Sequence, residues 1–74
     1  MSPVRVATPE QSIRDAAMLM AELDAGVLPV GENDRLVGMI TDRDITVRGV
    51  ATGQAPERCT VGEIMSTELR YWRA

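Results

Sequence analysis

The residues best suited to chemistry in this sequence are Thr41 and Asp44, in the stretch GMITDRDI of residues 38–45. Their spacing suits a helix N-terminus, where Thr at the N-cap and an acidic residue at N3 bond backbone N–H groups that otherwise lack partners. The same geometry suits a ligand, because free N–H groups at a helix start favour a phosphate and a carboxylate accepts hydrogen bonds from ribose hydroxyls. Taken alone, the spacing favours the cap.

Catalytic chemistry is poorly supported by the remaining polar residues. The chain has no histidine, and its single cysteine, Cys59, has no identifiable base. Asp42 and Asp44 are candidates for an acid–base pair or for Mg²⁺ ligands, but at i and i+2 of a helix they point to different faces. We therefore expect a protein that is not an enzyme, requires no cofactor or metal, and carries Cys59 as a free thiol in a linker.

Length and composition indicate a small globular unit that needs a partner. The chain has 74 residues, of which 45% are hydrophobic, so it is too apolar for disorder yet too short to bury a large core alone. Neither disulfides nor a metal cluster are available as staples, which favours oligomerisation, with a homodimer as the expected state. The net charge of −3 and the scattered basic residues make nucleic acid an unlikely partner. No membrane span or secretory signal is evident, and we expect a cytoplasmic location.

Hydrophobic periodicity predicts a strand followed by a helix in the first part of the chain. Residues 4–8 alternate as in a short strand, and from Ser12 onward the apolar residues recur with helical spacing. Ser12 and Asp15 form a capping-box start and Gly26 a natural stop, although Thr8-Pro9 could open the helix one turn earlier. The residues on the apolar face are Ile13, Ala16, Ala17, Met20 and Leu23.

The second part of the chain predicts a hairpin and two further helices. Residues 27–30 and 36–41 are apolar strands around the turn residues GENDR, and a helix over 42–52 should end near Gly53. Residues 60–66 begin another short helix, with Thr60 and Glu63 as a capping box. A crossover helix makes the first two strands parallel, and the hairpin makes the third antiparallel.

The stretch GVLPVGENDRLVGMITDRDI of residues 26–45, between two amphipathic helices, resembles the CBS domain, named for cystathionine β-synthase. The resemblance covers about residues 4–66, and TDRDITVRGVATG is most similar to small bacterial proteins made only of CBS domains. It implies an α+β fold: a β-α-β-β-α unit with a small three-stranded sheet packed against two helices. Family members usually carry such motifs in pairs, called Bateman modules, so this unit is expected to pair with a second motif in trans.

The segment VGEIMS of residues 61–66 resembles the helix that leads into a second motif. The expected organisation is therefore a CBS motif over residues 4–58, followed by a linker and the lead-in helix and strand of an incomplete second motif over 59–74. Either two chains supply the pair, or this sequence is a fragment of a two-motif protein. Tyr71 and Trp72 lie in this last segment, as an interface anchor or as part of a frayed end.

The resemblance also assigns roles in an adenosine-binding cleft. Thr41 would face the phosphate and Asp44 the ribose, with Arg43 a candidate for the phosphate; its alternative is a solvated first-turn residue. Val27 and Pro29 would line the adenine pocket, although core and edge-strand roles also explain them. Thr8 would border the same pocket.

Two classes of function follow, and both are non-catalytic. The first is a regulatory module that binds AMP, ADP, ATP or S-adenosylmethionine between paired motifs and signals through dimer geometry. The second is a ligand-free dimerisation and assembly module, in which Thr41 and Asp44 serve only as a cap. Nucleic-acid binding is a distant third.

Overall fold

The computed structural model describes residues 5–67 as an α+β unit. Helix α1 (Ile13–Leu23) precedes an antiparallel hairpin of β1 (Val27–Glu32) and β2 (Arg35–Thr41). Four short helical elements follow: α2 (Asp42–Asp44), the π-helical turn η1 (Ile45–Gly49), the 3₁₀ turn η2 (Val50–Thr52) and α3 (Val61–Ile64).

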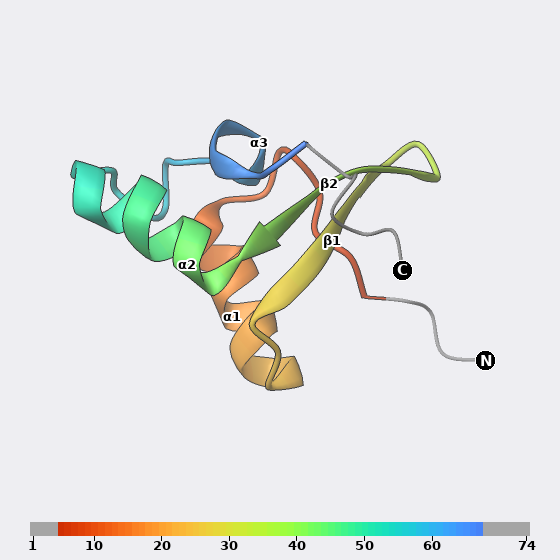
Figure 1. The fold of residues 1–74 in the computed structure, drawn as a ribbon, viewed down its shortest axis with the longest axis horizontal. Coiled ribbons are helices and arrows are strands. Elements are labelled where there is room, and N and C mark those ends of the chain that lie inside the picture. The colour runs from red at the N-terminus through yellow and green to blue at the C-terminus, as the bar shows by residue number, and fades with distance from the viewer. Residues whose placement is uncertain (1–4, 68–74) are drawn as a thin grey trace.

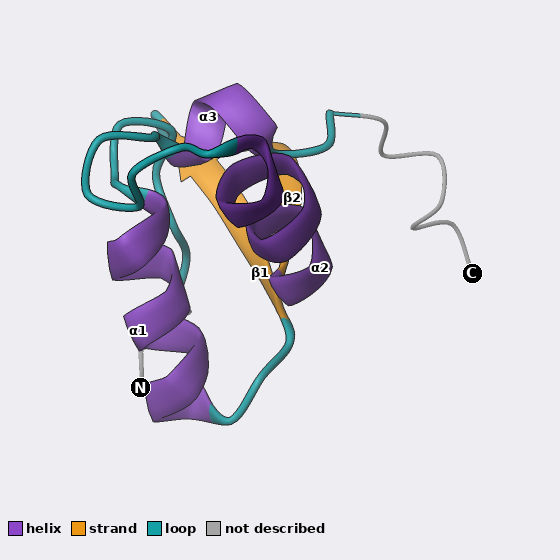
Figure 2. Ribbon diagram, turned by 90° about the vertical axis from the view of Figure 1, so that its left-hand side faces the viewer, coloured by secondary structure: helices purple, strands orange, loops and turns teal. Residues whose placement is uncertain are grey.

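Helix α1 packs against β1 and η1, and α3 packs against η1. The tip of the hairpin and the helical segment 42–52 lie toward opposite ends of the molecule (Figure 1). Figure 2 shows α1 and α2 as separate helices beside the hairpin, with α3 near the top of the view. The predicted packing of a small sheet against two helices is confirmed.

Helix α1 begins where the sequence predicts and ends earlier than predicted. The Ser12 hydroxyl accepts a hydrogen bond from the Asp15 N–H at 3.1 Å, which is the predicted cap. The predicted stop at Gly26 is wrong, because Asp24 occupies the C-cap with a left-handed φ of 54°. A short polar residue tolerates this conformation, and the Asp24 N–H reaches the carbonyls of Ala21 and Met20.

Within the described residues, the strand predicted over residues 4–8 contributes a single bridge to the sheet. Ala7 pairs with Val30 in the predicted parallel sense: its N–H donates to the Pro29 carbonyl at 2.9 Å and its carbonyl accepts from Gly31 at 2.8 Å. The next ladder bonds would need N–H donors at Pro29 and Pro9, and proline has none. The sheet therefore has two strands extended by one parallel bridge, in place of three full strands. Val4, in the predicted strand, lies outside the described residues.

The helix predicted over residues 42–52 forms as one helical run that changes its hydrogen bonding along its length. It starts as α2, continues as η1 and η2, and ends at Gly53, whose φ of 84° gives the predicted left-handed stop. Gly49 explains how closely this run packs on α1. A Cβ at position 49 would lie 2.6 Å from Cδ1 of Ile13, so only glycine permits the approach without a shift.

The core extends beyond the motif into the segment that follows it. Buried side chains come from α1, both strands, η1 and residues 59–64: Ala7, Ile13, Ala16, Met20, Leu28, Val30, Ile40, Ile45, Cys59, Val61 and Ile64. Backbone bonds hold this segment at both ends. Ile13 N–H donates to the Cys59 carbonyl at 2.8 Å, and Met39 and Ser66 exchange two bonds of 2.9 and 2.8 Å. The predicted lead-in helix is thus packed into the core of the preceding motif. The strand predicted after it, with Tyr71 and Trp72, lies outside the described residues.

The start of α3 contains a capping interaction that shifts the pKa of its acidic residue, Glu63. The Glu63 carboxylate accepts hydrogen bonds of 3.0 Å from both the backbone N–H and the hydroxyl of Thr60. These bonds favour the ionised carboxylate, the backbone bond more than the hydroxyl, and lower the pKa of Glu63 below its usual 4.5.

Replacing Glu63 by Gln should therefore change the acid limb of the stability curve. A carboxyl whose pKa is depressed by folding stabilises above its unfolded pKa, and this contribution is lost as pH falls through the folded pKa. The stability difference between the native chain and Glu63→Gln should be constant near neutral pH and shrink below about pH 4.5, measured by urea unfolding at several pH values. The cap variant Ser12→Ala, which carries no titrating group, is the control; a pH-independent difference for Glu63→Gln would contradict the prediction.

Candidate functional site

Thr41 and Asp44 form a reciprocal cap at the point where β2 ends and α2 begins. Asp44 N–H donates to the Thr41 hydroxyl at 3.0 Å, and Thr41 N–H donates to Oδ2 of Asp44 at 3.0 Å. Both side chains are half-buried. The capping interpretation of this pair is confirmed, and its possible role toward a ligand stays a prediction. Oδ1 of Asp44 forms no hydrogen bond within residues 5–67.

Strand pairing brings Thr41 together with two other predicted site residues. Val27 lies opposite Thr41 and Pro29 lies opposite Met39, so these four share one face of the hairpin, which we call the outer face. The intervening pair, Leu28 and Ile40, points into the core and is fully buried. One face of the hairpin therefore packs on the core, and the outer face is the opposite one. Val27 on the outer face is 38% exposed.

Thr8 joins the outer face at the far edge of β1. Because Ala7 pairs with the core-facing Val30, the neighbouring Thr8 points the other way, toward Pro29. Thr8 and Pro29 line one groove of about 690 Å³, which confirms that the structure brings these two residues together. This groove does not include Thr41 or Asp44, which lie at the opposite end of the hairpin.

Arg43 and Asp42 lie on the exposed first turn of α2. Within the part of the chain that the structure describes, the Arg43 guanidinium forms no ion pair or hydrogen bond, so it is free to meet an anion. Asp42 lines a separate hollow of about 440 Å³ between the end of α1 and the start of α2. Asp42 and Asp44 therefore do not face a common site, as their helical spacing predicted. No group of three metal-ligating side chains occurs among the described residues.

The groove beside Thr8 was not predicted from the sequence. Most of its lining comes from the hairpin tip, whose residues GENDR were interpreted only as a turn: the groove contains Val6, Thr8, Glu10, Pro29 and all of residues 31–36. The tip bends sharply because Asn33 and Asp34 both have positive φ, 54° and 63°. The only sequence signal for this groove was an apolar residue, Leu36, directly after the turn; its exposure of 51% is known only from the structure.

Cys59 is a buried core residue, and its interpretation as a free thiol in a linker is wrong in its location. The side chain is 1% exposed and belongs to the buried core cluster, together with residues of α1 and α3. Burial raises the pKa of the Cys59 thiol, and the negative charge of Glu63 raises it further. The thiol is therefore protonated and shielded near neutral pH, as in an inert core cysteine.

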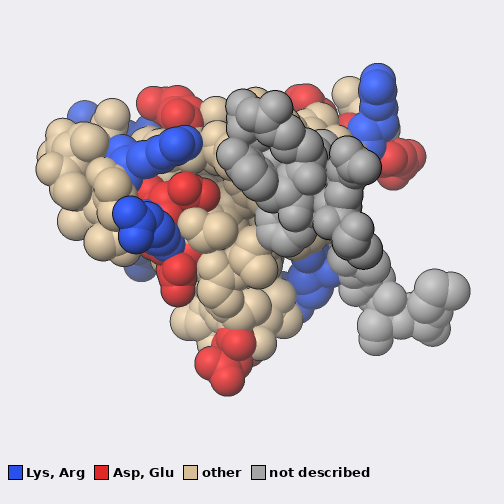
Figure 3. Space-filling model, in the orientation of Figure 1, with Lys and Arg blue, Asp and Glu red and all other residues tan. Residues whose placement is uncertain are grey.

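The described helices and the charges on one face of the molecule bear on membrane and nucleic-acid binding. None of the helices in residues 5–67 is long and apolar enough to cross a bilayer. On the face seen in Figure 3, acidic and basic side chains lie next to one another, without the single-sign stripe that nucleic acid favours.

Comparisons with known proteins agree with this geometry. The family model of the CBS domain matches residues 1–49. The CBS domain-containing protein YhcV of Bacillus subtilis is 46% identical over 66 residues, covering 89% of this chain and 46% of the relative. Hypoxic response protein 1 of Mycobacterium tuberculosis is 44% identical over 62 residues, covering 82% of this chain and 43% of the relative.

A solved structure shows the same fold. A putative signal-transduction protein with CBS domains from Burkholderia ambifaria superposes with a TM-score of 0.86 at 31% identity, covering 92% of this chain and 50% of that one. The chain thus spans about half the length of the curated relatives it matches. The family-model match over residues 1–49 and these similarities show that the chain belongs to the CBS-domain family.

Proposed function

We propose that this chain acts as a regulatory CBS module that pairs with a second CBS motif and binds an adenosine-containing ligand between the two. The observation that carries the proposal is the outer face, where one motif gathers Val27, Pro29 and Thr41 on a surface left partly open to solvent. A ligand such as AMP, ADP, ATP or S-adenosylmethionine would be enclosed only when a second motif covers that surface. The module would be non-catalytic and cytoplasmic, and would signal through the geometry of a homodimer.

The chemistry of the outer face supports a nucleoside in particular. Val27 and Pro29 offer apolar contact for a base. Pro29 lacks an N–H and cannot extend the parallel bridge at Ala7, so within residues 5–67 that edge of β1 has no further ladder bond where a base edge could approach. Oδ1 of Asp44 is available as an acceptor for ribose hydroxyls, and the exposed Arg43 guanidinium lies one residue away for a phosphate. Thr8 would contact the ligand from the far edge of β1.

Exposed apolar side chains on this side of the molecule support pairing. Val6, Val27 and Leu36 are 40%, 38% and 51% exposed, and a chain of this size gains much of its missing core from a partner. A homodimer is therefore the proposed assembly.

The reciprocal cap favours one alternative, an assembly module without a ligand. Each partner already satisfies a backbone N–H of the other, and such a cap is worth about 0.5–2 kcal/mol, which explains the pair without any bound molecule.

Thermal and urea unfolding with AMP, ADP, ATP and S-adenosylmethionine distinguishes the two functions. A ligand that binds the folded pair should stabilise it by about 1.4 kcal/mol at ten times its Kd. Asp44→Asn should remove this response, because the amide retains an acceptor for the cap but loses the charge that strengthens hydrogen bonds to ribose. Ser12→Ala, which weakens the cap of α1, should lower the baseline and retain the ligand response.

Light scattering on the same samples tests the pairing. A dimer is expected at micromolar concentration, and a folded monomer would contradict pairing in trans. A dimer that responds to none of the four ligands would leave the assembly module as the function.

A further inference from the structure

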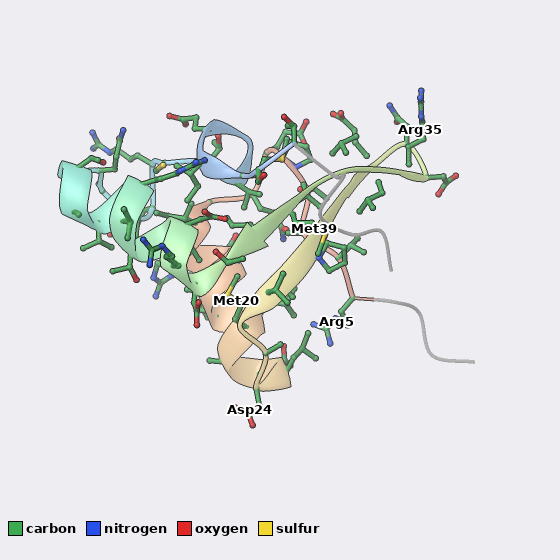
Figure 4. All side chains as sticks on the ribbon, in the orientation of Figure 1. Arg5, Met20, Asp24, Arg35 and Met39 are labelled. Atoms are coloured by element: carbon green, nitrogen blue, oxygen red, sulfur yellow. The ribbon has the colours of Figure 1, made fainter. Side chains whose placement is uncertain are left out.

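The hollow of about 440 Å³ between the end of α1 and the start of α2 shares no lining residue with the groove beside Thr8 or with the proposed ligand site. Two carboxylates line it, those of Asp24 and Asp42, and no basic side chain of the described residues does. Figure 4 shows the Asp24 side chain projecting outward from the end of α1. Because a cation here would meet two carboxylates, the hollow suits a guanidinium or ammonium group.

The exposed side of α1 that borders this hollow carries a regular row of side chains, which we call the charged row. Its members follow at intervals of three, four and three residues, so they lie along one side of the helix: Arg14, Ala17, Ala21 and Asp24. All four are exposed, and neither charged member forms an ion pair within residues 5–67. The row is therefore basic at its start, acidic at its end and narrow between them.

The charged row is complementary to its own reverse. Positions 14 and 24, like positions 17 and 21, are centred on position 19, so an antiparallel copy of α1 places Arg14 opposite Asp24 and Ala17 opposite Ala21. A two-fold axis forms each of these contacts twice, and the alanines permit helix axes about 8 Å apart. We propose that two copies of this chain associate through α1 in this register, with Arg14 of each copy inserted into the hollow of the other beside Asp24 and Asp42.

This contact is weak and acts in addition to pairing through the outer face. Ten positions separate its charged ends, or about 15 Å of helix, so it engages far fewer residues than the about 20–30 a side of a standard interface. Exposed ion pairs add little. The contact therefore forms well above the micromolar concentrations expected for outer-face pairing. It joins two dimers if that pairing occurs and two single chains if it does not, so the mass doubles in either case.

Sedimentation over a concentration series in low-salt buffer measures this association. The average mass of the native protein should rise toward twice its value in dilute solution, and high salt should suppress the rise. Arg14→Glu should abolish the rise, because it sets a carboxylate against Asp24. Arg58→Glu makes the same charge change at another exposed arginine and should retain the rise. Asp44→Asn should retain it too, because Asp44 does not line the hollow.

Mixing two variants tests the pairing of charges. Arg14→Glu and Asp24→Arg should each stay unassociated alone, because like charges then face one another. Mixed in equal amounts they should associate, since the introduced glutamate meets the introduced arginine and a native Asp24 meets a native Arg14 at the other end. Circular dichroism should show that both variants are folded, and variants that had merely lost structure would not recover on mixing.

Disulfide cross-linking tests the register. Chains carrying Ala17→Cys and Ala21→Cys, mixed with oxidised glutathione, should form a cross-linked dimer several-fold faster than either chain alone. Cys59 should not interfere, because it is buried. Glu22→Cys is the matched control for Ala21→Cys, since Glu22 is exposed on another side of α1, where it lines a groove with Arg5.

Each of these measurements can contradict the proposal. A native mass that stays constant with concentration would overturn it, as would an Arg14→Glu variant that associates like Arg58→Glu. Mixed charge variants that remain unassociated would exclude the contact between Arg14 and Asp24. Cross-linking of Ala17→Cys that is equally fast with Glu22→Cys and with Ala21→Cys would exclude the antiparallel register.

Discussion

Ile64→Ala should lower the free energy of unfolding of the whole chain by about 2–5 kcal/mol, because it deletes most of a buried side chain and leaves a cavity. Ile64 is 4% exposed, and it packs with Ile13 and Ile45 in one continuous core although it lies in the helix after the motif. Globular domains have about 0.05–0.15 kcal/mol of stability per residue, so a loss of this size removes a large share of the total for a chain this short.

Urea unfolding followed by circular dichroism measures this effect. Val47→Ala, at a residue 47% exposed on η1, is the matched control and should change stability by no more than about 0.5 kcal/mol. One cooperative transition with a lower midpoint would show that α3 unfolds with the motif. A small loss like that of Val47→Ala would contradict the prediction and make α3 a separate appendage.

Gly38→Ala should destabilise the chain by about 1–3 kcal/mol, because the added methyl group overpacks a fixed backbone contact. A Cβ at position 38 would lie 2.7 Å from the Ser66 carbonyl oxygen and 3.0 Å from the Met65 sulfur. The sulfur can move, but the carbonyl is held by its bond from the Met39 N–H. Accommodating the methyl group must therefore separate Ser66 from β2.

Gly31→Ala is the control in the same hairpin. Its added Cβ would meet only ordinary contacts, at 3.5 Å from the Arg35 carbonyl and 3.6 Å from Val6, so its effect should be small. Urea midpoints compare the two variants, and hydrogen exchange of the Met39 amide reports whether the bridge to Ser66 is lost. Equal midpoints and a Met39 amide that stays protected in Gly38→Ala would contradict this account.

Ile64→Ala and Gly38→Ala both test whether the segment after residue 58 is part of the same folded unit as the motif. The family pattern suggested a motif over 4–58, followed by a linker and a lead-in helix and strand over 59–74. The structure packs Val61 and Ile64 of that helix into the same core as α1 and the strands. Movement of this segment would be coupled to the hairpin through Gly38 and Ser66.

Local features of the fold could be predicted because their causes lie within a few residues. The caps at Ser12, Thr41 and Thr60 each depend on a partner three positions away, and the stop at Gly53 depends on its own freedom to adopt positive φ. The parallel sense of the Ala7 pairing was predicted, but its reduction to a single bridge was not, although Pro9 and Pro29 lack the donors on either side of it. The family resemblance, which depends on the order and spacing of such features, was confirmed for the same reason.

For the candidate site, the sequence identified residues, and the structure determined which of them meet. Strand register places Val27 and Pro29 on one face with Thr41, and the parallel bridge at Ala7 brings Thr8 beside Pro29. Their roles toward a ligand stay a prediction, because the same bonds between Thr41 and Asp44 satisfy a cap. The tip groove was missed because residues 31–36 and Val6 become neighbours only after folding.

The sequence by itself determined the helix starts, the hairpin, the family and the candidate residues, all through local patterns of polarity and spacing. Only the tertiary structure decided that Asp24 ends α1, that Cys59 lies in the core, and that α3 packs into the same core as α1 and the strands. The last two outcomes depend on contacts between residues far apart in the chain, such as the approach of Ser66 to Gly38. Neither periodicity nor spacing records such contacts, because packing between distant segments is fixed by shape and volume.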